Sequence, residues 1–475
     1  MKPFLLFLTV AFISLSAKGQ ITFKKIIPSD QWKFGCSIIQ TFDEGYAVCG
    51  LTPNDYTQPQ LFGYFVKTDK YGDTLWTKKY LYGPHTYESV FKQTADSGFI
   101  ICGTIQSLTH DDLYLIRTNS TGDTIWTKKF MGRTGYAIEV TPDQGYIIAG
   151  RFYDYCMILK IDSSGNEVWE KFFHPMGMTS SASFATAICN TNDNGYIVTG
   201  NCDNPPAYFD SRYIFLIKLD NMGDSIWGKI YQHVYLQQVF SIVQTDDNGY
   251  VLGGYLDSLG NYLNSHGYII RTNDIGDTTW TYASTFNNGN QFRSVHKALS
   301  GGFIAGGGET SGYSGDILLE MISSTGELEW RKTFADTSYD GARSVRSTTD
   351  GGIILCSNIF TSTTWDYDIV IIKTDSNGVL TGLNNNFKKE PNRLSIFPNP
   401  CSFFTHLTFE LLDNVLVEID LLDNFGKVIK TVLRENVSAG KHQLLVDLNN
   451  LSEGIYYFRL NCKEGVTIQK IIVIR

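Results

Sequence analysis

Seven copies of one pattern fill most of this chain and constrain its fold more than any other feature. Each copy begins with a short apolar strand, continues through a tight turn that ends in glycine, and enters a second strand such as Tyr146–Gly150. Aspartate can cap its own turn, and glycine accepts the left-handed conformation that closes a tight hairpin. The seven turns are Asp43-Glu44-Gly45, Asp96-Ser97-Gly98, Asp143-Gln144-Gly145, Asp193-Asn194-Gly195, Asp247-Asn248-Gly249, Ser300-Gly301-Gly302 and Asp350-Gly351-Gly352.

The second half of each copy holds a loop of variable length, a third strand and another tight turn. The glycines of these turns are residues 72, 122, 165, 223, 276, 326 and 378. Four residues later, six copies carry a tryptophan: Trp76, Trp126, Trp169, Trp227, Trp280 and Trp330. Four short antiparallel strands repeated about every 50 residues are typical of a propeller blade. The sequence therefore predicts an all-β fold with a seven-bladed propeller, and a linear β-solenoid is the alternative.

The two ends of the repeat region favour a closed ring. The seventh copy has Gly382 in place of tryptophan, and its fourth strand fades after Leu380. A spare strand at residues 21–26 has a Lys-Lys pair with apolar neighbours, similar to Trp76–Tyr80. We expect this N-terminal strand to close blade seven, because closure removes exposed sheet edges. The propeller then spans residues 20–381.

Residues 1–19 form a predicted signal peptide. Lys2 supplies the positive end, Phe4–Leu15 is the apolar run, and Ala17-Lys18-Gly19 is a small-x-small cleavage site. A membrane anchor is the alternative, but spanning a bilayer takes about 20 apolar residues.

The turn and tryptophan of each copy resemble the repeat of quinoprotein-like propellers, as in Asp69 to Trp76. In that family the tryptophan packs between neighbouring blades, so the resemblance implies a structural role for the six tryptophans. Those enzymes usually have eight blades and hold a quinone with a metal ion. The sequence offers no carboxylate cluster for that metal, so the activity is not carried over and no cofactor is expected.

The composition changes after Asn384-Asn385-Asn386, which lies in a predicted linker at residues 382–391. Apolar and polar residues alternate over Leu416–Leu421, which predicts a strand, and Asp423–Gly426 is a predicted hairpin turn. About seven strands in about 80 residues suit a small immunoglobulin-like β-sandwich. The sequence therefore predicts a second domain at residues 392–475.

This second domain resembles the type A C-terminal sorting domain of the type IX secretion system of the Bacteroidota. The matching pieces include Phe397–Pro400, Gly426–Val428, Leu451–Tyr457 and Lys470–Ile474, and the residues that carry the sorting motif are Pro398, Asn399, Pro400, Gly454, Tyr456 and Lys470. Cys401-Ser402-Phe403 departs from the small residues common after the first piece. The resemblance implies export by an outer-membrane sorting machinery, which leaves the protein secreted or attached to the outer cell surface. An ordinary adhesion module is the alternative.

Charge and motifs exclude several functions. The net charge is −9 and no basic run occurs, which argues against a nucleic-acid partner. No catalytic motif, calcium loop or zinc pattern is present, so no catalytic residue and no metal are expected. Nine cysteines leave at least one thiol unpaired, and their disulfide pairing stays open.

The loops between second and third strands and between blades vary in length and carry aromatic residues and histidines. Function tends to lie on variable loops held by a rigid scaffold. The predicted ligand-binding face comprises Tyr56, Tyr87, His110, Tyr155, Tyr208, Tyr262, Tyr313 and Trp365. The sequence favours a non-enzymatic binding or adhesion propeller for a glycan or a protein. A secreted polysaccharide hydrolase or lyase with an unrecognised site is the alternative.

Overall fold

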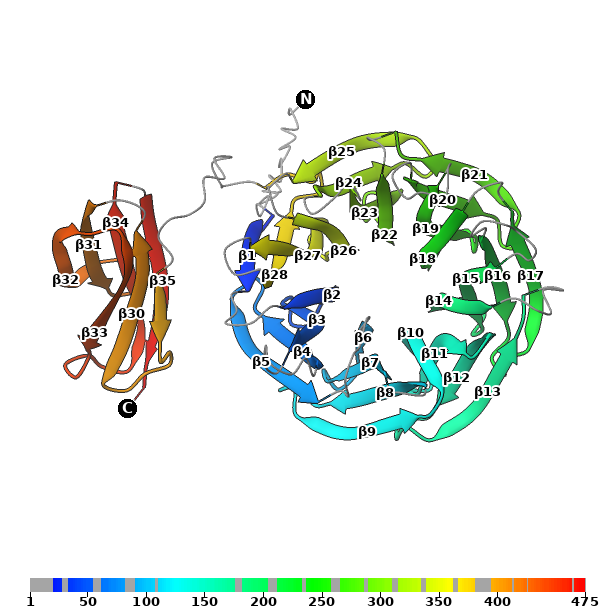
Figure 1. Cartoon of the computed structure of the whole chain (residues 1–475), viewed down its shortest axis with the longest axis horizontal. Coiled ribbons are helices and arrows are strands. Elements are labelled where there is room, and N and C mark those ends of the chain that lie inside the picture. Colours follow the sequence, from blue (N-terminus) through cyan, green and yellow to red (C-terminus); the bar gives the residue numbers. More distant parts are fainter. Residues whose placement is uncertain are drawn as a thin grey trace, which may run out of the picture. The chain divides into compact units, whose positions relative to one another are not determined.

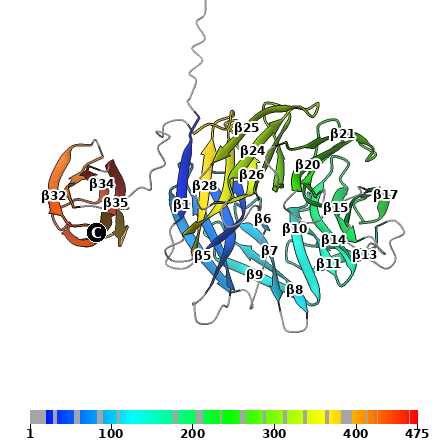
Figure 2. The same ribbon diagram turned by 45° about the horizontal axis from the view of Figure 1, so that its top comes forward.

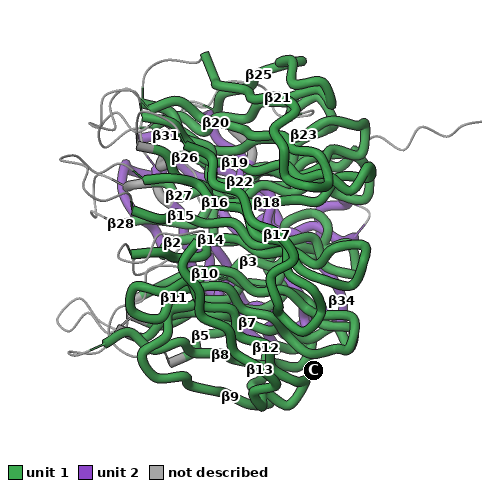
Figure 3. The backbone as a smooth tube through the Cα atoms, turned by 90° about the vertical axis from the view of Figure 1, so that its right-hand side faces the viewer, with its two compact units in different colours: residues 1–383 green, residues 384–475 purple. Residues whose placement is uncertain are grey.

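The computed structural model of the 475-residue chain describes residues 20–27, 33–53, 61–81, 90–106, 110–175, 182–203, 212–232, 236–257, 265–285, 289–309, 315–334, 339–361, 366–380, 394–411, 414–424, 426–463 and 465–474. All regular elements in these ranges are strands. The chain forms two compact units, which divide between Leu383 and Asn384, inside the predicted linker (Figure 3).

Unit one contains seven four-stranded antiparallel sheets. Blade one is β2 (Phe34–Gln40), β3 (Tyr46–Pro53), β4 (Leu61–Thr68) and β5 (Thr74–Leu81). Blade two is β6 (Val90–Gln93), β7 (Phe99–Gln106), β8 (Asp111–Thr118) and β9 (Thr124–Phe130). Blade three is β10 (Arg133–Val140), β11 (Tyr146–Phe152), β12 (Tyr155–Ile161) and β13 (Glu167–Phe173). Blade four is β14 (Ser183–Asn190), β15 (Tyr196–Asp203), β16 (Arg212–Leu219) and β17 (Ser225–Tyr231).

The remaining blades follow the same order. Blade five is β18 (Leu236–Gln244), β19 (Tyr250–Asp257), β20 (Ser265–Thr272) and β21 (Thr278–Ala283). Blade six is β22 (Asn290–Lys297), β23 (Phe303–Glu309), β24 (Ile317–Ile322) and β25 (Leu328–Phe334). Blade seven contains β26 (Tyr339–Ser347), β27 (Ile353–Thr361) and β28 (Asp366–Thr374), and its fourth strand is β1 (Phe23–Ile27).

The seven sheets stand around a common axis, with the first strand of each blade innermost and the fourth outermost (Figure 1). Apolar residues on the faces of neighbouring sheets form seven separate cores, one between each pair of adjacent blades. The core between blades seven and one joins Phe23 and Ile371 to Ile38 and Val66. Because every interface is filled, the ring is closed, and the predicted propeller fold is confirmed.

Blade seven is assembled from both ends of the repeat region. β1 runs antiparallel to β28, with Phe23 opposite Lys373 and Ile27 opposite Ile369, and the two strands lie side by side in both ribbon views (Figures 1 and 2). In blade one the corresponding partner of Lys67 is Trp76. Phe23 therefore occupies the position that tryptophan fills in the other blades.

The tryptophans pack against the second tight turn of the next blade. A Cβ on Gly122 would lie 2.8 Å from the ring of Trp76, and one on Gly72 would lie 2.5 Å from the ring of Phe23. Gly72 and Gly122 also have a φ of 79°, a conformation that favours glycine. Each of these glycines is thus required both by the turn and by the neighbouring aromatic ring.

The glycine of the first turn has a different role from the predicted one. The left-handed residue is the one before it, such as Glu44 with a φ of 64°. Gly45 is required by close packing instead, because a Cβ there would lie 2.3 Å from the carbonyl oxygen of Thr68 and 2.6 Å from the Lys67 amine. In six blades the prediction placed the left-handed residue one position too late, whereas in blade six both Gly301 and the predicted Gly302 have a positive φ.

Unit two is a small β-sandwich. One sheet contains β29 (Ser395–Phe397), β30 (Phe404–Leu411) and β33 (Gly440–Asp447). The other contains β31 (Val415–Leu422), β32 (Val428–Val437), β34 (Gly454–Cys462) and β35 (Gly465–Val473), in the order β32-β31-β34-β35. Leu407, Val417, Phe458 and Ile471 are buried in one core between the sheets. The predicted fold of this part of the chain, a small β-sandwich, is confirmed.

Candidate functional site

The two faces of the propeller differ in their connections. The first-to-second and third-to-fourth turns lie on one face, here the turn face, and the longer connections lie on the other, the loop face. Among the predicted site residues, His110 and Tyr155 are described by the structure. Six others lie outside the described residues: Tyr56, Tyr87, Tyr208, Tyr262, Tyr313 and Trp365.

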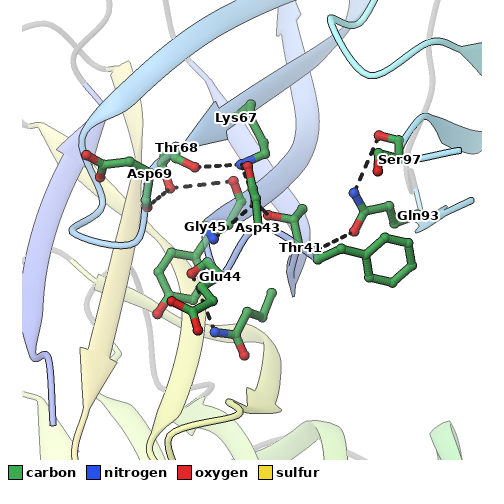
Figure 4. Close-up of polar contacts among 12 residues, drawn as sticks. Thr41, Asp43, Glu44, Gly45, Lys67, Thr68, Asp69, Gln93 and Ser97 are labelled. Atoms are coloured by element: carbon green, nitrogen blue, oxygen red, sulfur yellow. Dashed lines mark hydrogen bonds and ion pairs between the residues drawn. The ribbon is translucent and has the colours of Figure 1, made fainter. Parts of the chain in front are cut away.

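On the turn face, six blades share an arrangement that we call the turn lock. In blade one Lys67, whose side chain is 6% exposed, donates to both carboxylate oxygens of Asp43 at 3.0 and 2.8 Å and to the Thr68 carbonyl at 2.8 Å (Figure 4). Thr41 donates to the same carboxylate, as does the backbone of Gly45. The other cation–carboxylate pairs are Arg117–Asp96, Lys160–Asp143, Lys218–Asp193, Arg271–Asp247 and Lys373–Asp350.

Burial alone would raise the pKa of Asp96, but hydrogen bonds from Thr94 and Arg117 outweigh burial and lower that pKa to about 2. Blade six lacks the turn lock. Ala298, Ser300 and Met321 stand where the other blades have threonine, aspartate and a cation. Because the threonine, the aspartate and the cation are all replaced in blade six, no buried cation is left there without a carboxylate. The repeated cation on the third strand was visible in the sequence, but its partner became clear only in the fold.

On the loop face, His110 is held by a buried carboxylate. The Asp112 side chain is fully buried and contacts His110 Nε2 at 3.2 Å and Lys129 Nζ at 2.7 Å. Gly132 N also donates to Asp112 at 2.8 Å. Burial alone would raise the pKa of Asp112, yet the bonds from Lys129 and Gly132 lower it. Asp112 is therefore an ionised acceptor that positions His110 at the start of β8.

Tyr155 lies beside other aromatic rings at the turn between β11 and β12. Its ring is 4.2 Å from that of His174 between centroids, and the residue is 43% exposed. Tyr153 is 67% exposed and packs edge-on against Phe152 at 4.7 Å. Blade three thus presents exposed tyrosines on the loop face, and such rings offer a broad face with a polar edge to a ligand.

The first strands add aromatic–arginine clusters that the sequence analysis missed. The Arg343 guanidinium lies 4.6 Å from the ring centroid of Phe34, which packs edge-on against Tyr367. Arg293 lies 4.4 Å from the ring of Phe240, which stacks on Tyr255. A third cluster contains Arg212, Phe184 and Tyr136. These clusters join blade seven to one, five to six, and three to four.

Several cluster residues occupy one structural position, a β-bulge near the loop-face end of the first strand. The register shifts there in blades one and three to seven, and the extra residues are Cys36, Tyr136, Thr186, Phe240, Arg293 and Arg343. A bulge re-aims a side chain and is over-represented next to functional sites. Because bulges follow from strand pairing, they could not be predicted from the sequence pattern.

Three further carboxylates in the described blades are paired with cations. Glu320 is fully buried and bonds to Arg331, Tyr282 and Ser284. Glu170 pairs with Arg133, and Asp203 pairs with Arg212. Within the described ranges, no group of three or more His, Cys, Asp or Glu residues could hold a metal ion. In the same ranges, no helix is long and apolar enough to cross a membrane.

In unit two, the sorting-motif residues meet at the last strand. Asn399 Nδ2 donates to the Lys470 carbonyl at 2.8 Å, and Ile472 N donates to Asn399 Oδ1 at 2.9 Å. The Thr405 hydroxyl donates to the Pro398 carbonyl, and Cys401, next to Pro400, pairs in parallel with Val473. On β34, which begins at Gly454, Tyr456 lies opposite Ile471 and donates to the Ser452 carbonyl. Pieces separated by about 70 residues thus form one contact region around β35.

Residues 395–474 match the family model of the secretion system C-terminal sorting domain. Unit two is a type IX sorting domain. The sorting domain marks proteins that are secreted or anchored at the cell surface, so this protein is secreted or attached to the outer cell surface. It also implies contact with the secretion and sorting machinery. The predicted family and location are confirmed.

The other comparisons give weak structural likenesses. PorZ, a surface component of the type IX secretion system of Porphyromonas gingivalis, is 10% identical, covers 91% of this chain and 69% of its own, and gives a TM-score of 0.38. YCF48 from Cyanidioschyzon merolae is 8% identical, covers 74% of this chain and 98% of its own, and gives a TM-score of 0.45. Both scores are below 0.5, so the propeller assignment rests on the observed sheets. No curated protein matches the chain.

Proposed function

We propose that the propeller is a non-enzymatic binding module for a glycan or protein ligand, which the sorting domain delivers outside the cell. The observation that carries this proposal is the pair of exposed tyrosines in blade three together with the three aromatic–arginine clusters of the first strands. Tyrosine, tryptophan and arginine are the residues enriched at binding hot spots. On the turn face, by contrast, six blades use their repeated charges for their own turns.

The cation partners of the described carboxylates favour binding over hydrolysis. A glycosidase needs a pair of carboxylates, one of them protonated as a general acid. Asp112, Glu170 and Glu320 each have a lysine or arginine partner. Such pairs suit a role in holding loops and orienting neighbours.

The test is a glycan and protein array probed with the mature protein and two matched tyrosine variants. Tyr155→Ala removes a loop-face ring that is 43% exposed, and Tyr71→Ala removes a turn-face ring that is 52% exposed. We expect Tyr155→Ala to weaken binding about tenfold, and Tyr71→Ala to leave it unchanged. A loss confined to Tyr71→Ala would refute the loop-face assignment. Release of shortened sugars from any bound polysaccharide would favour the hydrolase alternative.

We further propose that residues 1–19 are a signal peptide and that residues 392–475 act only in export. Deleting residues 392–475 should trap a folded propeller in the periplasm, because the propeller has its own cores. Normal amounts of the truncated protein outside the cell would refute this part of the proposal. An unprocessed N-terminus on the exported protein would refute the signal peptide.

A further inference from the structure

One position of the innermost strands carries an unusual set of side chains. It lies four residues before the aspartate or serine that opens each first turn, and its occupants are Ile39, Lys92, Glu139, Cys189, Val243, His296 and Arg346. Charged residues also stand elsewhere on the first strands, as Arg293 and Arg343 at the bulge, Arg133 in β10 and Lys297 in β22. We call Lys92, Glu139, His296 and Arg346 the axial cluster.

Members of the axial cluster contact their neighbours around the ring. Lys92 Nζ of blade two bonds to Glu139 Oε1 of blade three at 2.5 Å. Their side chains are 32% and 18% exposed, so solvent reaches them. His296 Nδ1 of blade six accepts a hydrogen bond from the Ser347 backbone of blade seven. The cluster therefore consists of two pairs on neighbouring inner strands, Lys92 with Glu139 on blades two and three, and His296 with Arg346 on blades six and seven.

The charges of the axial cluster also act across the axis. Burial, followed by the charges of Arg346 and Lys92, lowers the pKa of His296 to about 3. Blades two and six are not neighbours, so the influence of Lys92 on His296 passes across the ring. Glu139 of blade three likewise raises the pKa of Arg346 in blade seven, although burial has the larger effect and lowers it.

The net charge of the axial cluster is positive. Lys92 and Arg346 are cationic, His296 is neutral, and Glu139 is the single carboxylate of the cluster. The nearby Lys297 is paired with Asp246, which is exposed. Both described hydrogen bonds of Arg346 come from Nη1, to Ser294 Oγ and the Val345 carbonyl. Among the described residues, this leaves Nε and Nη2 as a planar donor pair for a ligand oxygen.

We propose that the axial cluster binds one anionic group, a carboxylate or a sulfate, with Arg346 as the main donor and Lys92 as the second cation. The group belongs to a free small anion or to an acidic polysaccharide. A positive site in a chain of net charge −9 is specific, because the surrounding negative charge repels anions elsewhere. The site lies among the first strands and does not depend on the loop-face proposal.

The experiment is titration calorimetry of the mature full-length protein at fixed ionic strength, with sodium sulfate, sodium glucuronate, sodium polygalacturonate and neutral glucose. Arg346→Gln should weaken anion binding about tenfold, and Glu139→Gln should strengthen it about tenfold, because each change alters one charge beside the ligand. The matched control is Lys171→Gln, which removes a lysine from an outermost strand where it pairs with Asp224 at 2.7 Å. It should leave affinity unchanged.

Opposite effects of two neutralising substitutions separate charge recognition from a loss of folding. Equal small-anion and polymer affinity per acidic group identifies a free anion as the ligand, and tighter polymer binding identifies a polysaccharide. As a second readout, a bound anion should raise the pKa of His296 in an NMR titration. The proposal is overturned if the wild type binds no anion, if both variants shift affinity in the same direction, or if Lys171→Gln matches Arg346→Gln.

Discussion

Blade seven has the same four-stranded structure as the other six blades but is built from two separate segments of the chain. Blades one to six are each one continuous stretch of chain, whereas blade seven combines β26–β28 with β1, more than 300 positions earlier in the sequence. In β1, Phe23 replaces the tryptophan, and Lys25 pairs with Asp73 just as Lys78 pairs with Asp123. The comparison teaches that the repeat is defined by its contacts with the next blade and tolerates a break in the chain.

The largest expected effect comes from removing β1. A protein that begins at Gln31 loses the burial of Phe23 and Ile27, about 3–6 kcal/mol of unfolding free energy, and exposes the edge of β28. We expect aggregation or a much lower melting temperature relative to a protein that begins at Gln20. Thermal unfolding and size-exclusion chromatography measure both. Equal stability of the two proteins would show that blade seven does not need its fourth strand.

A single substitution at Phe23 sharpens the comparison. Phe23→Ala should cost about 3 kcal/mol, because it empties the space between blade seven and Gly72. Phe23→Trp introduces the residue of the other six blades and should change stability by less than about 1.5 kcal/mol. Urea unfolding measures both, with Trp126→Ala as the matched loss in blade two. If Phe23→Ala were harmless while Trp126→Ala was not, the two positions would not be equivalent.

The turn lock of blade seven gives the next smaller effect. Asp350→Ala should cost about 2 kcal/mol, because it leaves the fully buried Lys373 amine without its carboxylate. The triple change Thr348→Ala, Asp350→Ser and Lys373→Met copies the residues of blade six and should cost less than the single change. Chemical unfolding measures which of the two variants loses more unfolding free energy. A triple variant much less stable than the single one would mean that blade six is stabilised in another way.

The same locks predict loss of stability in acid. Hydrogen bonds outweigh burial and hold the pKa values of Asp96 and Asp193 at about 2, against an ordinary 3.8. The folded state thus binds fewer protons than the unfolded state, so this stabilisation is complete above about pH 4 and is lost as the pH falls toward 2. Unfolding free energies measured between pH 5 and pH 2 test this. A variant of blade four with Thr191→Ala, Asp193→Ser and Lys218→Met should show a shallower loss.

The smallest effect is expected at Lys25. The Lys25–Asp73 pair spans 2.8 Å, but both side chains are well exposed, so Lys25→Met should change stability by less than about 1 kcal/mol. Lys78→Met is the equivalent change between blades one and two and should match it. Salt should reduce both effects. A large loss at Lys25 alone would indicate that blade seven depends on this contact in a way that the other blades do not.

Short-range patterns made most of the fold predictable. Each hairpin requires its turn residues at fixed spacing, and these recur seven times. The sorting-motif pieces likewise keep their order, and β29–β35 follow the predicted number of strands. The register of β1 was not readable. Aligning its Lys-Lys pair with Lys78-Lys79 would place Thr22 at the tryptophan position, whereas pairing with β28 places Phe23 there.

The sequence by itself determined the seven units, their turns and the sorting domain, because each depends on residues close together in the chain. Only the tertiary structure decided which distant groups meet. It brought Lys67 to Asp43, Arg343 to Phe34, and Lys92 to within electrostatic range of His296. These contacts depend on strand register, on the bulges and on closure of the ring. A one-residue shift in pairing would turn each side chain to the opposite face. Within a hairpin the turn sets the register, but no turn joins β1 to β28, so no local pattern sets theirs.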